Sequence, residues 1–181
     1  MTSVQRDYRR YPDLGRIGDL VRPTEPHAFD LGLAHVPTNG RKPRPGDSVY
    51  YDTNANGFAV PTSDAQRLIV CGIVSFDPGV VQGRLSAAPS GANSDQFVEF
   101  DDEDPIKVTV FGTVWVMAGA AMEYGQQIVQ DSYTSPDWLY DPIAAPTTVA
   151  AIHSTAIFCV SPSPVAANGL AQARIGYGRI R

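Results

Sequence analysis

The feature that most constrains the fold is the run "IKVTVFGTVWV", residues 106–116. Valines stand at positions 108, 110, 114 and 116, and the residues between them are Thr, Phe, Thr and Trp together with one glycine. This alternation of β-branched residues is typical of a half-buried strand, and Gly112 marks a bulge or a barrel bend within it. The following "AGAAMEYG" is too short for a stable helix and has no N-cap residue. We therefore predict a strand, a wide turn and another strand.

Comparable patterns recur through residues 46–181. Short strands at 48–51 and 58–60 flank Asn56-Gly57, a pair that favours a tight hairpin turn. "RLIVCGIVSF" (67–76) is a continuous apolar run and predicts a strand covered on both faces. Further strands are expected in "QFVEF", "TTVAAIHSTAIFCV" and "AQARIGYGRIR". "RPGDSVYY" (44–51) and "EYGQQIVQ" (123–130) share a glycine, a polar spacer and a strand, which indicates a turn leading into a strand in each.

The fold class follows from these strands and from the turn formers between them. Glycine and proline together number 31 (16 and 15), and charged residues make up only 18% of the 181 residues. Such a chain is long enough to bury a core, and its composition favours an all-β domain. The prediction is a β-barrel or β-sandwich body over residues 46–181.

Residues 1–45 differ from this body. Six prolines, at 12, 23, 26, 37, 43 and 45, rule out a long helix, and each removes a donor that a central strand needs. The segment has eight Arg and Lys against five Asp and Glu, a net charge of +3, whereas residues 46–181 have six against fourteen, a net of −8. We therefore expect an extended N-terminal arm that seeks an acidic protein surface.

Residue patterns for catalysis and metal binding are weak. Asp101, Asp102, Glu103 and Asp104 are adjacent but lack the ligand spacing of a calcium loop, so a solvated acidic loop is expected. His27, His35 and His153 are dispersed, and no carboxylate completes a triad beside His153 and Ser154. Phosphate-binding glycine loops and C-x-x-C motifs are absent. We expect no enzyme activity, no metal and no cofactor.

Nucleic acid and membrane are not expected partners. The body is acidic, and the arginines of the arm alternate with aspartates, which suits a protein surface better than a phosphate backbone. The sequence has neither an apolar run of membrane-spanning length nor an apolar signal sequence at its start, so we expect a product made in the cytoplasm. Cys71 and Cys159 lie in apolar runs, where buried reduced thiols are the expected state, although the sequence leaves a disulfide between them open.

The stretches 44–79 and 106–130 resemble the structural cement, or head decoration, proteins of tailed bacteriophages. The residues that carry the resemblance are "GDSV", "VCGIV", "VTVFGTVWV" and "AMEYGQQIV", and the ending "RIGYGRIR" is similar to the closing strand of that family. The resemblance covers residues 44–181 and rests on β patterning. It implies a small β-barrel or tulip-like body that binds the outside of the capsid lattice, often as a trimer, and reinforces the joints between capsomers.

These expectations define a hypothesis about function. The protein would be a virion component on the capsid exterior, with the major capsid protein and its own copies, as a homotrimer, as partners. The predicted anchors lie in the arm, where arginine and tyrosine are residue types that dominate interfaces: Arg6, Tyr8, Arg9, Arg10, Tyr11, Arg16 and Arg22.

An alternative function is a glycan-binding or host-surface-binding β-sandwich of a phage tail or fibre. Aromatic residues would form its sugar platform: Tyr50, Tyr51, Tyr133, Trp138 and Tyr140. Three of them lie in "SYTSPDWLY", which is equally consistent with a packed loop.

Overall fold

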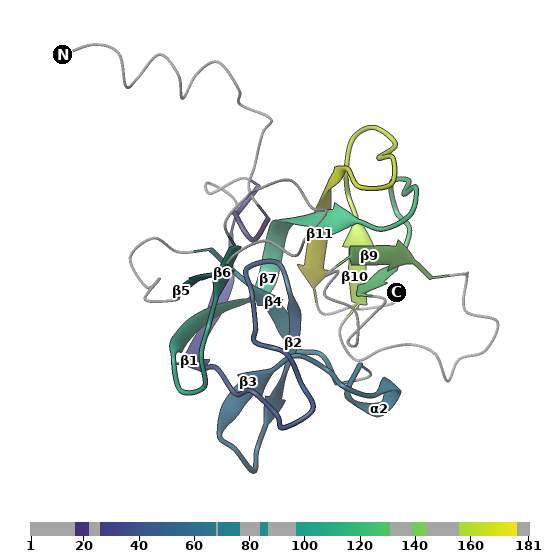
Figure 1. Cartoon of the computed structure of the whole chain (residues 1–181). Coiled ribbons are helices and arrows are strands. Elements are labelled where there is room, and N and C mark those ends of the chain that lie inside the picture. The colour runs from purple at the N-terminus through teal and green to yellow at the C-terminus, as the bar shows by residue number, and fades with distance from the viewer. Residues whose placement is uncertain are drawn as a thin grey trace.

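The computed structural model describes residues 17–21, 26–67, 69–76, 84–86, 97–130, 139–143 and 156–176. Within these residues the chain is almost entirely β, as the sequence predicts, and the strands form one curled sheet with a separate pair of short strands (Figure 1). The described residues include no helix long and apolar enough to cross a membrane.

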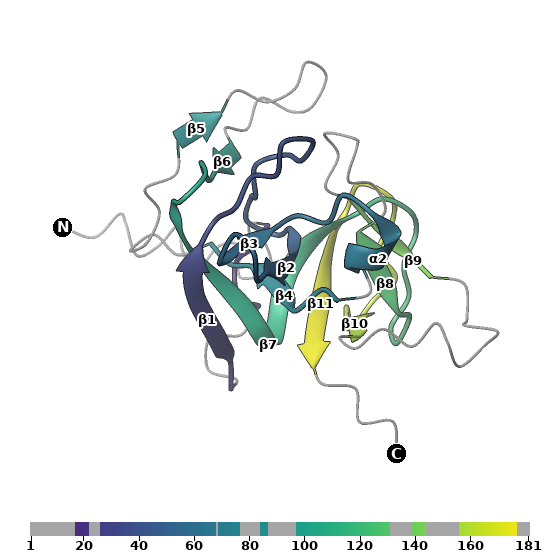
Figure 2. The same ribbon diagram turned by 90° about the horizontal axis from the view of Figure 1, so that it is seen from below.

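The curled sheet is organised around one long strand, β7 (Pro105–Ala118). Its first half pairs with β1 (Ala28–Leu33) and β4 (Gly72–Val74), and its second half pairs with β11 (Leu170–Gly176). The strand bends between the two halves, which diverge in Figure 2. Gly112 stands at the change of partner with φ 134°, a backbone angle that side chains rarely allow, so the predicted bend is confirmed.

The first half of β7 supports a barrel-like group of strands. β2 (Ser48–Asp52) pairs with β4 and, as predicted, forms a hairpin with β3 (Gly57–Ala59). Asn56 adopts φ 55° in the hairpin turn. Phe58 of β3 forms a β-bridge with Ala34, the residue that follows β1, so the curled sheet closes back toward β1. The enclosed core is made of Ala34, Val49, Phe58, Val60, Val74, Phe100, Ile106 and Val108.

The second half of β7 supports another group. β10 (Ala156–Cys159) pairs with β11, and its Phe158 bridges to Gln127 at the start of β8 (Ile128–Gln130). β8 pairs with β9 (Leu139–Pro142), which returns to β7 as a parallel neighbour. A second core fills this group and includes Val114, Val116, Met122, Ile128, Tyr140, Ile157 and Ile175.

Two smaller elements complete the described structure. β5 (Arg84–Ser86) and β6 (Phe97–Glu99) form a two-stranded sheet, and α2 (Asp64–Arg67) is a single helical turn. α2 shortens the strand predicted over residues 67–76 to Gly72–Val74, which is buried on both faces as expected. The turn forms because Gln66 accepts hydrogen bonds from the backbone and hydroxyl of Thr62, at 2.7 and 2.9 Å.

The stretch after β7 is not helical, as predicted. Residues 119–127 form bends and a turn, in which Gly125 has φ 85°, before β8 begins. The similar stretch at Pro45-Gly46 also turns, with φ 91° at Gly46, and leads into β2. The interpretation of both stretches as turns that lead into strands is confirmed.

Residues 17–21 and 26–45 contact the body, which corrects the expectation that the prolines of this segment keep it out of the sheet. β1 pairs along six residues with β7, and Leu20 bridges to Val114. The prolines do not prevent this because β1 contains none of them and lies at the edge of the sheet (Figure 2). Residues 1–16 lie outside the described part, and for them the extended arm stays a prediction.

Candidate interaction surface

The most tightly connected polar group in the described structure is the fully buried carboxylate of Asp47. It accepts two hydrogen bonds from the guanidinium of Arg41, at 2.5 and 2.6 Å, one from the backbone N–H of Arg44 at 2.7 Å and one from Gln130 Nε2 at 2.8 Å. A carboxylate offers about four acceptor positions, so the acceptor positions of Asp47 are all occupied. Burial lowers the pKa of Arg41 and the charge of Asp47 raises it, with a net upward shift.

Neighbouring side chains extend this network between distant strands. Ser48 donates from its backbone N–H and its hydroxyl to Gln130 Oε1, at 2.9 and 2.7 Å. The hydroxyl of Tyr140 donates to the carbonyl of Gly46 at 2.8 Å, and burial followed by the charge of Asp47 holds the pKa of Tyr140 well above its usual value. The two stretches with similar sequence, 44–51 and 123–130, therefore contact each other. The network fixes residues 41–48 to β8 and β9.

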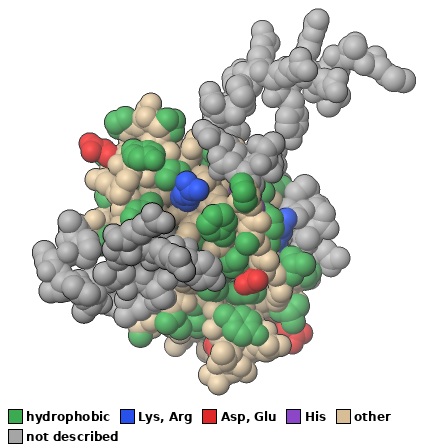
Figure 3. Space-filling model, turned by 180° about the vertical axis from the view of Figure 1, so that it is seen from behind, with side chains coloured by type: hydrophobic (Ala, Val, Ile, Leu, Met, Phe, Trp, Pro, Cys, Tyr) green, Lys and Arg blue, Asp and Glu red, His purple; other side chains and the backbone are tan. Residues whose placement is uncertain are grey.

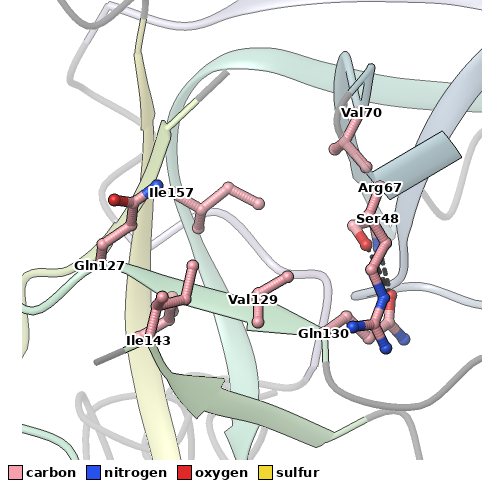
Figure 4. Close-up of a pocket in the computed structure, with 9 residues that line it drawn as sticks. Ser48, Arg67, Val70, Gln127, Val129, Gln130, Ile143 and Ile157 are labelled. Atoms are coloured by element: carbon pink, nitrogen blue, oxygen red, sulfur yellow. Dashed lines mark hydrogen bonds between the residues drawn. The ribbon is translucent and has the colours of Figure 1, made fainter. Parts of the chain in front are cut away.

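A small cavity lies beside this network (Figure 4). Its volume is about 20 Å³, enough for one water molecule but not for an organic substrate. Val70, Ile143 and Ile157 line its apolar side, and Ser48 and Gln130 line its polar side. Among the described residues, the cavity therefore has room for a single water molecule beside the polar network.

The acidic turn at residues 101–104 is tied to the chain that follows β1. Asp101 forms an ion pair with Lys42 at 2.5 Å, and Asp102 accepts hydrogen bonds from the backbone of Val36 at 2.8 Å and pairs with His35 Nδ1 at 3.2 Å. Asp104 caps the turn by accepting from the N–H of Asp101 at 2.7 Å. Asp101 and Asp102 thus tie the turn to residues 35–42, and Asp104 holds the turn itself. Among the described residues no group of three His, Cys, Asp or Glu could hold a metal ion.

The remaining sequence candidates are half-buried or buried, or they lie outside the described residues. His27 stacks on Phe29 with ring centroids 6.0 Å apart. Cys71 and Cys159 are both unpaired, as expected, and Cys159 is buried. The predicted anchors of the arm, at positions 6, 8, 9, 10, 11, 16 and 22, lie outside the described residues, as do His153 and Ser154.

The aromatic platform of the alternative function is not assembled among the residues that the structure describes. Tyr50 and Tyr140 are buried in the cores, at 4% and 0% exposed, so their predicted place in a surface platform is wrong. Tyr51 is exposed but packs edge-on against Phe58. Tyr133 and Trp138 lie outside the described residues.

Sequence reasoning missed an exposed apolar surface on β1, which we call the β1 strip: Phe29, Leu31, Leu33 and Pro105. Leu31 is 73% and Leu33 44% exposed, and both lie on the same face as Phe29 because side chains alternate along a strand. Pro105 of β7 lies directly opposite Leu33. The signal in the sequence is "FDLGL", an alternation typical of a strand that lies between prolines.

A second exposed surface lies over the other half of the sheet and is called the β11 groove: Val21, Thr113, Tyr124, Val160, Pro162, Gln172 and Arg174. The groove has a volume of about 250 Å³. Tyr124 is 72% exposed at its side, and Phe158 lies directly opposite Arg174 in the neighbouring strand at 36% exposed. Hydrophobic side chains outnumber charged ones over the visible rear face of the molecule (Figure 3). Exposed apolar groups of this kind mark sites of protein contact.

Comparisons with known proteins add a structural likeness. The chain is similar to a chain in the solved structure "The capsid of Myoviridae Phage XM1", with 18% sequence identity, a TM-score of 0.45 and coverage of 88% of each chain. No family model matches this chain. The comparison with curated proteins gave no match either.

Proposed function

We propose that this protein is a capsid cement protein of a tailed bacteriophage, which binds the outside of the head lattice and stabilises the joints between capsomers. The observation that carries the proposal is the combination of a β body with exposed apolar surfaces on both halves of its sheet. The sequence resemblance to cement proteins lies in the strands and turns that build this body, namely β2, β4, β7 and the turn before β8.

The interior supports a structural role over a catalytic one. Catalytic carboxylates need a free acceptor position or an exchangeable proton, whereas the four acceptor positions of Asp47 are occupied by Arg41, Arg44 and Gln130. The nearby cavity has room for one water molecule. We therefore propose that the protein acts by contact alone, without enzymatic activity or cofactor.

Residues 1–16 are proposed as the part that binds the major capsid protein. They contain four arginines against two aspartates and include Tyr8 and Tyr11. Sixteen extended residues reach up to about 55 Å, which is enough to contact a neighbouring capsomer. Since many copies bind one shell, modest contacts by each copy add up through multivalency.

The experiment adds purified protein to phage shells that lack it and measures how many copies bind per shell. The variant to compare is a deletion of residues 1–16, which spares Ile17–Val21 and β1 and should therefore keep its β circular dichroism spectrum. We expect the full chain to bind the shell exterior to saturation and the deletion to bind at least tenfold more weakly. The contacts of the arginines are electrostatic, and raising the salt concentration from 0.1 to 0.5 M roughly halves the Debye length. Binding should therefore also weaken over this range of salt.

Two results would overturn the proposal. If the full chain fails to bind shells, the protein is not a cement protein, and binding to glycans on an array would then favour the tail or fibre alternative. If the deletion variant binds as well as the full chain, the arm is not the attachment site.

A further inference from the structure

We propose that residues 17–21 form a latch, a short segment that closes across the bend of the sheet and opens as a unit while the rest of the β body stays folded. The latch is a property of the free chain and goes beyond attachment to a shell. It stands at the N-terminal end of the described residues and is drawn in purple beside β7 in Figure 1.

Backbone hydrogen bonds hold the latch between two parts of the sheet. The N–H of Gly18 donates to the carbonyl of Trp115, in the second half of β7, at 2.8 Å. The carbonyl of Gly18 accepts from the N–H of Phe76, just after β4, at 2.9 Å. Trp115 in turn donates from its N–H to the carbonyl of Asp19 at 2.9 Å. The latch therefore connects the strands that pair with the first half of β7 to its second half.

Two glycines allow the latch to close on the turn before β2. Gly18 has φ 85°, and a Cβ added to it would lie 2.6 Å from the Cβ of Pro45. Gly46 has φ 91°, and a Cβ added to it would lie 2.1 Å from Cγ2 of Ile17. A side chain at either glycine would separate the latch from the turn, so a methyl group at Gly18 should favour the open state.

The latch has few apolar contacts compared with the strands around it. Leu20 is half-buried and packs against the second core, and only Gly18 of the latch is fully buried. The two groups of strands stay joined without the latch, because β7 runs through both and Asp47 binds Gln130. Segments with few buried apolar contacts open at a lower free energy than the core does. The latch is therefore expected to open on its own.

Opening of the latch would change the length of the segment ahead of β1. With the latch closed, 16 residues precede it and reach up to about 55 Å. With the latch open, the next described contact with the sheet is at His27, which stacks on Phe29, so 26 residues precede it and reach up to about 90 Å. The latch would thus set the reach of the segment that binds the capsid. This consequence rests on the proposed function, whereas the latch itself does not.

The test is amide hydrogen exchange of the full chain, followed by NMR. The reference is the N–H of Val74, which donates to the carbonyl of Asp47 at 2.8 Å within the body. In the unmodified chain the amides of Gly18 and Trp115 should exchange at least tenfold faster than that of Val74. Low concentrations of urea should accelerate Val74 much more than Gly18 or Trp115, because only global unfolding exposes a large surface.

Two alanine variants separate opening of the latch from unfolding of the body. Gly18→Ala should accelerate exchange at Trp115 and Phe76 at least tenfold. The matched control is Gly125→Ala, since Gly125 also has φ 85° but has nothing within 4 Å of an added Cβ. It strains the body equally whether the latch is open or closed. Gly125→Ala should therefore accelerate Val74 by roughly five- to thirtyfold and leave Trp115 and Phe76 unchanged.

Three results would each overturn the proposal. The first is exchange of Trp115 at the same rate as Val74, with the same dependence on urea, in the unmodified chain. The second is a Gly18→Ala variant in which Trp115 and Phe76 exchange as slowly as before. The third is a Gly125→Ala control that accelerates Trp115 as much as Val74. Should Gly18→Ala fail to fold, the unmodified chain and the control still decide. All samples are free protein, so failure of the latch is distinguished from failure to bind shells.

Discussion

Replacing Asp47 by alanine should be among the most destabilising single changes in the described structure. The carboxylate is fully buried and holds Arg41, whose side chain is 16% exposed. Arginine cannot lose its proton, so Asp47→Ala leaves a buried positive charge without its partner. Breaking a buried pair in this way costs about 3–5 kcal/mol. Arg44 N–H and Gln130 Nε2 lose their acceptor as well, which places the expected loss near the middle of that range or above it.

The assay is equilibrium unfolding in urea followed by tryptophan fluorescence. With a slope of about 2 kcal/mol per M, a loss of about 4 kcal/mol moves the midpoint down by roughly 2 M. A small domain has about 5–15 kcal/mol of stability in total, so the variant should be close to its limit of folding at 37 °C.

Two further variants separate the buried charge from general damage. Lys42→Ala removes the partly exposed ion pair with Asp101 and should cost no more than about 1 kcal/mol. Adding Arg41→Met to Asp47→Ala removes the unpaired charge and should restore part of the loss. The reasoning is refuted if Asp47→Ala shifts the midpoint no more than Lys42→Ala does, or if the double variant is less stable than the single one.

Three other predictions concern the bend, the tyrosine hydroxyl and the thiol. Gly112→Ala should lower the free energy of unfolding in urea by several kcal/mol, since φ is 134° and the added methyl group would meet the ring of His27 at 2.3 Å. The control Gly125→Ala, whose added methyl group would have nothing within 4 Å, should cost only about 1–2 kcal/mol because of its positive φ. Tyr140→Phe should cost about 1–3 kcal/mol in the same assay, because a buried carbonyl loses its donor. Burial and then a nearby carboxylate raise the pKa of Cys71 from 9.0 to about 11, so its alkylation by iodoacetamide, followed by mass spectrometry, should be slow at pH 8 and rise about tenfold per pH unit up to that value. The same upward shift links the free energy of unfolding to pH, because the unfolded chain releases the thiol proton at a lower pH than the folded chain does. The stability that the thiol contributes is fully present below pH 9 and is lost as the pH rises to about 11.

The parts of the fold that the sequence predicted are those set by local patterns. Alternating valines identified β7, Gly112 identified its bend, and Asn56-Gly57 identified the hairpin of β2 and β3. In each case the backbone geometry is a property of a few neighbouring residues, so no knowledge of the rest of the molecule was needed.

The parts that were missed depend on contacts between distant residues. Asp47 and Gln130 are 83 positions apart, and nothing in either stretch shows that the carboxylate and the amide meet. β1 was not predicted because prolines lie on both sides of it in the sequence. An edge strand such as β1 pairs on one side only, so nearby prolines do not keep it out of the sheet. The β11 groove requires residues from β7, β11 and the turn after β7 to come together, which only the tertiary structure specifies.

The central claim is that this protein lies on the outside of a phage head, and a cryo-EM reconstruction of the assembled particle tests it most directly. The account predicts density of the size of one curled β body per copy on the outer surface of the shell, at the joints between capsomers, with an extended segment that continues from Ile17 across the neighbouring capsid subunit. Density for this chain confined to the tail or fibres, or an outer surface of the head without it, would contradict the account.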